Sequence, residues 1–189
     1  MNYTFFPGIN QSRKFIYFII GKNAEEETFM SGMIKLKPLA VCLVIPILGG
    51  FLSSWLSGDI KEVYSRLILP AIAPPDWVFP VAWTVLYLMI GTASYLIYMS
   101  RSVPEEKRVG ALTFYGVQLV LNFLWTPLFF RFLWLKLAFA ELIALIVIAL
   151  FTTIAFYRIN KLTFLLMLPY LIWLSYAAVL NKLIIGLNY

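Results

Sequence analysis

Five apolar segments, each about as long as a membrane-crossing helix, dominate this sequence. They lie at residues 38–57, 77–100, 109–130, 135–157 and 162–187. A helix needs roughly 20 mainly apolar residues to cross the hydrocarbon core of a bilayer. Charged residues make up only 13% of the chain, whereas about 25% is usual for a soluble domain. The sequence therefore predicts an all-α fold, a bundle of five transmembrane helices in an integral membrane protein, and excludes an ordinary soluble enzyme.

The first 32 residues differ from the rest of the chain. Their apolar stretch, residues 15–20, is too short to cross a membrane, and a run of three glutamates follows it at 25–27. We expect either a poorly structured leader at 1–32 or a natural start at Met33. The membrane domain then occupies residues 33–189.

Residue types that are missing or rare exclude several kinds of chemistry. The chain contains no histidine and a single cysteine, Cys42. Imidazole-ligated haem, zinc sites built on histidine, Ser-His or Cys-His catalytic pairs and an internal disulfide are therefore excluded. We expect no metal site and no catalytic residue. The 15 Lys and Arg residues are scattered singly between apolar segments, which is typical of headgroup-facing loops and not of a nucleic-acid surface.

The loops predict how the helices are arranged. The longest connection, 58–76, contains Pro70, Pro74 and Pro75, so we expect a stiff, extended loop at the membrane surface. The other loops are short, which makes sequential helices antiparallel neighbours. Seven Lys and Arg residues lie on the side where the first span begins and five on the opposite side. The positive-inside rule then predicts an N-terminus inside.

A few side chains within the spans are candidates for a site. Trp83, Trp125 and Trp173 lie on three different predicted helices and could form a flat-walled slot, although ordinary helix packing explains such spacing more often. Gln118 and Asn122 share one helix face; polar amides there either join helices or orient a ligand.

One carboxylate, Glu141, lies well inside a span. It is either a ligand or proton site, or a side chain that is hydrogen-bonded to a neighbouring helix or reaches the interface. If the flat-walled slot holds a tetrapyrrole, cations must lie near it to pair with the ligand's propionates. Lys61, Arg66 and Lys182 are the candidates.

Three stretches of sequence carry a family resemblance. They are PAIAPPDWVFPVAWTVLYLMIGTASYLIY at 70–98, GVQLVLNFLWTPLFF at 116–130 and LPYLIWLSYAAVLN at 168–181. With all five spans in order, residues 36–187 resemble a bacterial-type member of the tryptophan-rich sensory protein and translocator protein (TspO/MBR) family.

The resemblance implies a fold and a function. The fold is a five-helix membrane bundle that forms a homodimer. For a bacterial-type member, the resemblance also implies a location in the bacterial cell membrane. The function is binding, sensing or transport of porphyrins such as protoporphyrin IX and other flat hydrophobic ligands, in a pocket capped by the first loop, with no further cofactor. One alternative is light- and oxygen-dependent porphyrin degradation that uses Trp83 and Trp173. Another is a structural bundle that interacts with membrane lipid or sterol.

The resemblance also implies the residues of the pocket. Its ligand-binding set on this chain is Tyr64, Pro74, Pro75, Trp83, Tyr87, Gln118, Asn122, Trp125, Glu141, Trp173 and Ala177. Ala177 is the small position one turn beyond Trp173, and Glu141 stands where relatives commonly have an aspartate. The chain departs from the family pattern at Leu69 and Ile72, where many relatives have a lysine and a tryptophan, and at Lys182, where the animal sterol motif has a tyrosine.

Overall fold

A computed structural model describes residues 35–189, and this part of the chain contains five helices that are long and apolar enough to cross a membrane. Their bounds are α2 Leu36–Leu56, α4 Val78–Met99, α5 Glu105–Thr126 with a π-helical extension η1 Pro127–Arg131, α6 Leu135–Ile159 and α7 Leu162–Asn188. The predicted five-helix membrane bundle is confirmed. The expectations for residues 1–32 lie outside the described residues.

Helix α5 begins earlier and ends differently from the predicted span 109–130. Pro104 precedes its first turn, which contains Glu105 and Glu106, and acidic residues at a helix N-terminus interact favourably with the helix dipole. At Pro127 the backbone has no N–H to donate, and the helix widens into the π-helical turn of η1. The chain then reverses through Leu133, whose φ is 55°.

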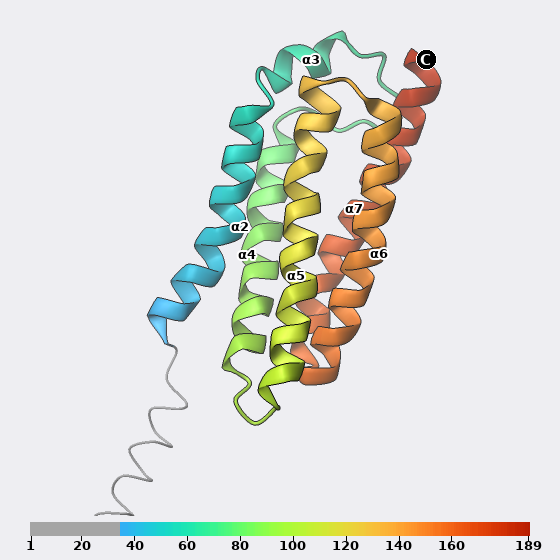
Figure 1. Cartoon of the computed structure of the whole chain (residues 1–189). Coiled ribbons are helices and arrows are strands. Elements are labelled where there is room, and N and C mark those ends of the chain that lie inside the picture. Colours follow the sequence, from blue (N-terminus) through green and yellow to red (C-terminus); the bar gives the residue numbers. More distant parts are fainter. Residues whose placement is uncertain (1–34) are drawn as a thin grey trace, which may run out of the picture. The chain divides into compact units, whose positions relative to one another are not determined.

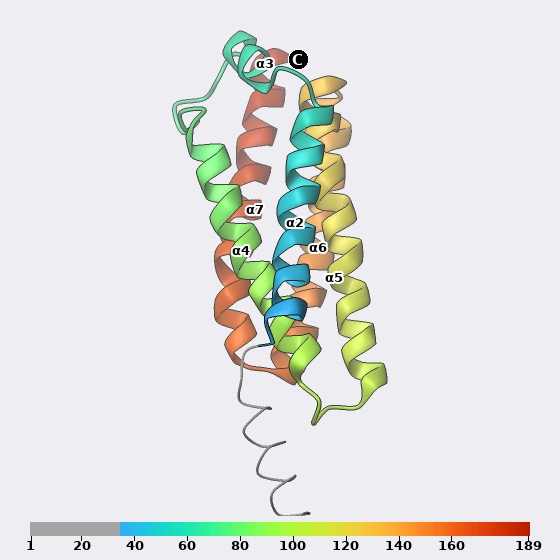
Figure 2. The same cartoon turned by 90° about the vertical axis from the view of Figure 1, so that its left-hand side faces the viewer.

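Consecutive long helices run antiparallel and lie side by side, as Figures 1 and 2 show. Helices α5, α6 and α7 contact one another in sequence, and α7 returns to contact α4. The main core is formed where these four helices meet, around Ile90, Leu145, Phe156 and Tyr170.

Helix α2 lies against α4 and α5 and approaches them through glycines (Figure 2). A Cβ on Gly50 would lie 2.2 Å from the Tyr87 ring, and one on Gly49 would lie 2.2 Å from the Phe123 ring. Ser53 fixes the same face, because its Oγ donates to the carbonyl oxygen of Phe123 at 2.5 Å. Only 11% of the apolar window of α2 is buried, compared with 44% for α4, so most of α2 faces outward.

The connection between α2 and α4 forms a cap over one end of the bundle. It consists of the short helix α3 Ile60–Arg66 and residues 67–77 (Figure 1). We expected an extended loop, but its first part is helical because Asp59 accepts a hydrogen bond from the Glu62 N–H at 3.0 Å and so caps α3.

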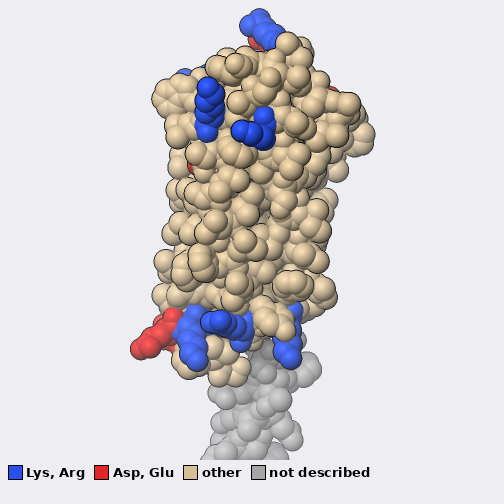
Figure 3. All heavy atoms as spheres, turned by 90° about the vertical axis from the view of Figure 1, so that its right-hand side faces the viewer, with Lys and Arg blue, Asp and Glu red and all other residues tan. Residues whose placement is uncertain are grey.

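The surface has the polarity of a membrane protein. On the face seen in Figure 3, the described Lys and Arg side chains gather toward the two ends, and the middle is formed by uncharged residues. An uncharged zone between two charged ends matches the hydrocarbon core of a bilayer with headgroups on either side.

Candidate functional site

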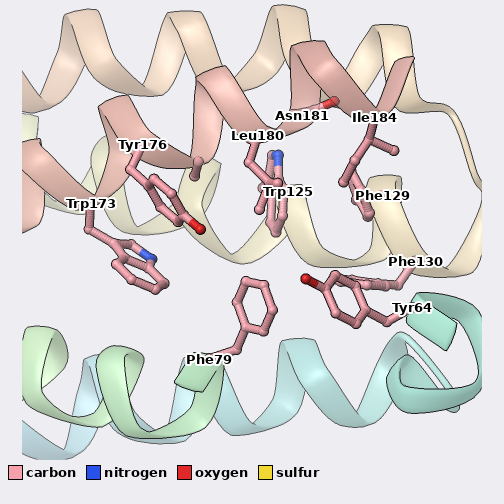
Figure 4. Close-up of a pocket in the computed structure, with 11 residues that line it drawn as sticks. Tyr64, Phe79, Trp125, Phe129, Phe130, Trp173, Tyr176, Leu180, Asn181 and Ile184 are labelled. Atoms are coloured by element: carbon pink, nitrogen blue, oxygen red, sulfur yellow. The ribbon is translucent and has the colours of Figure 1, made fainter. Parts of the chain in front are cut away.

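An aromatic pocket lies beneath the cap, at the end of the bundle where α7 finishes (Figure 4). Its volume is about 350 Å³, and part of this space is open at the mouth. The side chains that line it come from α3, α4, α5 with η1, and α7. They are Tyr64, Phe79, Trp125, Phe129, Phe130, Trp173, Tyr176, Ala177, Leu180, Asn181 and Ile184.

The rings of the pocket contact one another either edge to face or stacked, and their quadrupoles favour both arrangements. The Phe79 ring lies 5.3 Å from Tyr64 and 6.2 Å from Trp173, measured between centroids. On the opposite wall Trp125 stacks on Phe129 at 5.0 Å. Figure 4 shows the Phe79 ring on the opposite side of the enclosed space from Trp125. The site is therefore a slot with flat, apolar walls.

Four residues of the predicted ligand-binding set line this slot. They are Tyr64, Trp125, Trp173 and Ala177. Trp83 lies one layer deeper: it contacts Trp173 at 6.4 Å and stacks on Tyr87 at 5.3 Å, but it does not line the pocket.

Asn122 is the centre of a hydrogen-bonded network between three helices. The Tyr87 hydroxyl donates to Asn122 Oδ1 at 2.7 Å, and Asn122 Nδ2 donates to the Tyr170 hydroxyl at 3.2 Å. Gln118 is fully buried beside the same hydroxyl of Tyr170. Asn122 thus joins α4, α5 and α7, whereas neither polar atom of the Gln118 side chain has a hydrogen-bond partner within residues 35–189.

The remaining predicted residues lie around the pocket. Pro74 accepts a hydrogen bond from the Tyr64 hydroxyl at 2.9 Å, and the Pro75 carbonyl accepts one from the Val78 N–H at 3.0 Å where α4 begins. Glu141 is half-buried on α6 and does not line the pocket, and neither of its carboxylate oxygens has a hydrogen-bond partner within residues 35–189.

The charges near the mouth are paired. Lys61 Nζ lies 3.7 Å from Asp76, and Arg66 pairs with Glu62 one helical turn away. The third predicted cation, Lys182, lies over the Phe139 ring of α6 at 5.7 Å and is not part of the pocket wall. Burial raises the pKa of the Tyr64 phenol, and the neighbouring Tyr176 and Asp76 add to this effect.

Sequence reasoning missed seven of the lining residues. Helical spacing places Trp173, Ala177, Leu180 and Ile184 on one face of α7. A helical wheel centred on Trp173 would therefore have found Tyr176, Leu180 and Ile184. The inward positions of Phe129 and Phe130 follow from the π-helical turn, for which the sequence offers only Pro127. Within residues 35–189 no three His, Cys, Asp or Glu side chains come together as metal ligands.

Comparison with known proteins identifies the family. A family model described as the TspO/MBR family matches residues 41–185, which include every residue that lines the pocket. The chain belongs to the TspO/MBR family. The resemblance predicted from the sequence is thereby confirmed.

Curated relatives of this TspO/MBR protein occur in bacteria and mammals. Tryptophan-rich protein TspO of Chlorobaculum tepidum is 34% identical over 151 residues, which cover 79% of this chain and 95% of the relative. Translocator protein of Homo sapiens is 36% identical over 137 residues, covering 72% and 81%. Tryptophan-rich sensory protein of Cereibacter sphaeroides is 37% identical over 128 residues, covering 68% and 78%.

Proposed function

We propose that this membrane protein binds a flat, largely apolar molecule of the porphyrin class, such as protoporphyrin IX, in the aromatic pocket beneath the cap. The observation that supports this is the lining itself. Seven of its eleven side chains are aromatic, and they come from α3, α4, α5 with η1, and α7. Flat apolar walls with few polar groups favour a planar ligand that stacks against the rings.

The size of the pocket adds a requirement for the cap. The space between its side chains, about 350 Å³ with the open mouth included, is small for such a ligand. A tetrapyrrole is a large ligand, so the cap must move outward as the ring enters. The cap packs against η1 and α7 through a cluster around Tyr64, and exposed hydrogen bonds add to this contact, so entry of the ring has to displace both.

Equilibrium titration of protoporphyrin IX into the purified protein, followed by tryptophan quenching, tests this proposal. Ala177→Phe fills the slot and should weaken binding at least tenfold, whereas Ala140→Phe, the same change at an exposed position on α6, should leave it unchanged. Quenching that does not saturate, or that both variants retain, would contradict a porphyrin site in this pocket. Product analysis after irradiation of the complex would distinguish binding from light-dependent degradation.

We also propose an orientation, with the N-terminal end of α2 on the cytoplasmic side. Seven Lys and Arg residues lie at the end of the bundle where α2 begins and five at the end that carries the cap. Single cysteines at Ser102, between α4 and α5, and at Ser65 of the cap, in a Cys42→Ser background, test it. A membrane-impermeant maleimide should label only the cysteine at position 65 in intact bacterial cells.

The outward face of α2 supports a homodimer. Its exposed side chains are large and apolar, among them Val44, Phe51 and Trp55. Gly50, on the other face of α2, packs against Tyr87 of the same chain and is not part of this outward face. Cross-linking in bilayers tests this association, and monomers alone would contradict it.

A further inference from the structure

The wall of the aromatic pocket contains no lysine or arginine from residues 35–189. A porphyrin with two propionates brings two negative charges to this site, and a carboxylate that leaves water needs a charged or hydrogen-bonding partner. Five basic side chains lie at the end of the bundle that carries the cap, and each makes its contacts elsewhere. They are Lys61, Arg66, Arg131, Lys136 and Lys182.

Three of these cations contact parts of the bundle outside the pocket. Arg131 donates from its Nη1 to a carbonyl oxygen at the end of α2, at 2.7 Å. Lys136 lies over the Tyr189 ring, and Lys182 lies over the Phe139 ring, each with its Nζ 5.7 Å from the ring centroid. None of the three is part of the pocket wall.

The other two cations belong to the cap, which is itself negatively charged. Residues 58–77 contain three acidic and two basic side chains, so their net charge is −1. Besides burial and Tyr176, the charge of Asp76 raises the pKa of the Tyr64 phenol, so the pocket wall senses this acid. The exposed pair between Lys61 and Asp76 is weak, and Lys61 can turn toward a ligand. Asp76 is then left unpaired near the mouth, and the charge of the cap is unchanged.

The hydroxyl groups of the pocket residues are also in use. The Tyr64 hydroxyl donates to the Pro74 carbonyl oxygen at 2.9 Å. The Tyr176 hydroxyl donates to the Ile72 carbonyl oxygen at 2.8 Å. A hydroxyl has one hydrogen to donate, so neither group can donate to a ligand while these bonds are made. The remaining surface of the pocket is almost wholly apolar, which makes it a poor site for a carboxylate.

We infer that the pocket selects an uncharged tetrapyrrole, so that a porphyrin diester binds more tightly than the same ring with two free carboxylates. This rests on the proposed function, because it assumes that the aromatic pocket is the porphyrin site. It adds the charge state of the preferred ligand. The ring stacks against the aromatic walls in both cases, and the two carboxylates reduce the affinity because they meet an apolar wall beneath a negatively charged cap.

Protoporphyrin IX and its dimethyl ester test the inference, because they share one ring and differ in two negative charges at neutral pH. Each is titrated into the full-length protein in phosphatidylcholine liposomes and followed by tryptophan quenching. Protein-free liposomes give the partition of each porphyrin into the bilayer, so that affinities are compared for membrane-dissolved ligand. The wild type should bind the diester about tenfold more tightly or better, because a charge is costly to bury without a partner. Ala177→Phe should weaken the binding of both porphyrins.

Asp76→Asn removes the acid at the mouth and releases Lys61 from its partner. It should tighten binding of the dicarboxylate at least threefold and leave the affinity for the diester within twofold. Glu106→Gln makes the same change of charge in the first turn of α5, at the opposite end of the bundle, and should alter neither affinity. The ratio of the two affinities separates this electrostatic effect from a change in the fold of the cap, which would shift both affinities together.

Two results would overturn the inference. One is a wild type that binds the dicarboxylate as tightly as the diester, or more tightly. The other is an Asp76→Asn variant that keeps the wild-type ratio of the two affinities. Failure of the proposed function is distinguishable, because then neither porphyrin would bind in a saturable manner that Ala177→Phe weakens.

Discussion

The side chain of Asn188 makes two hydrogen bonds to the backbone of Ile68. The Ile68 N–H donates to Asn188 Oδ1 at 3.0 Å, and Asn188 Nδ2 donates to the Ile68 carbonyl oxygen at 3.0 Å. The last residue of α7 therefore holds the cap as a neighbouring strand would. Ile68 is exposed and Asn188 is half-buried, and Asn188 lies outside the residues 41–185 that match the family model. This contact thus joins the cap to α7 outside the pocket wall.

Asn188→Ala is expected to loosen the cap. Each exposed hydrogen bond contributes about 0.5–1.5 kcal/mol, so loss of both should increase the open population roughly fivefold or more. Hydrogen exchange of residues 67–77 should speed up, and association and dissociation of protoporphyrin IX should accelerate together. Asn160→Ala removes an asparagine-to-backbone bond at the opposite end of the bundle and should change neither rate. Equal exchange in both variants would contradict this role of Asn188.

The contact of α2 with α4 depends on Gly91. A Cβ at this position would lie 2.7 Å from the backbone oxygen of Cys42, which cannot move away as a flexible side chain can. Gly91→Ala should therefore lower stability by about 1–3 kcal/mol and separate α2 from the bundle. Gly116→Ala is the matched control, because no atom lies within 4 Å of a Cβ there. It should raise stability by about 0.5–1 kcal/mol, since alanine favours a helix over glycine. Thermal melting of both variants checks the opposite signs.

The spacing of residues along the sequence predicts which segments are helices, but it does not predict how each helix is rotated in the bundle. The five helices could be predicted because membrane-length apolar runs have few alternatives. The sequence does not predict which tryptophan faces the pocket, because that depends on the rotation of each helix about its axis. Trp125 and Trp173 line the slot, whereas Trp83 turns behind Trp173 and stacks on Tyr87.

Local signals were present for α3 but not for the wall formed by η1. Asp59 followed three residues later by Glu62 is a helix-start pattern, so the helical part of the cap was predictable. The π-helical turn after Pro127 changes the periodicity at the residues that bring Phe129 and Phe130 inward. Simple 3.6-residue periodicity fails there, and Asn181 escaped notice because a polar residue near a helix end suggests contact with water.

The network around Asn122 should be sensitive to loss of a single hydroxyl. Tyr87→Phe leaves Asn122 Oδ1 buried without its donor, which should cost about 1–3 kcal/mol and lower the melting temperature. Adding Asn122→Leu to Tyr87→Phe should cost less than the sum of the single changes, because the shared bond is lost only once. Additive effects in this double-mutant cycle would show that the 2.7 Å contact contributes little.

The cap should weaken at alkaline pH through Tyr64. Burial, together with Tyr176 and Asp76, raises the pKa of this phenol above its ordinary value of about 10. The folded protein therefore keeps the proton that the unfolded chain releases. The stabilisation is fully present below about pH 10 and is lost as the pH rises through the folded-state pKa. A phenolate also cannot donate to the Pro74 carbonyl, so the hydrogen bond that joins the two parts of the cap is lost with the proton.

Comparison of the wild type with Tyr64→Phe isolates this effect from the titration of other tyrosines. At pH 8 the wild type should release protoporphyrin IX more slowly than Tyr64→Phe, because only the wild type makes the bond to Pro74. As the pH rises above 10 the two dissociation rates should converge. Tyr157→Phe, a change at an exposed ring on α6, should follow the wild type at every pH. A constant ratio between the wild type and Tyr64→Phe from pH 8 to 12 would mean that this phenol does not control the cap.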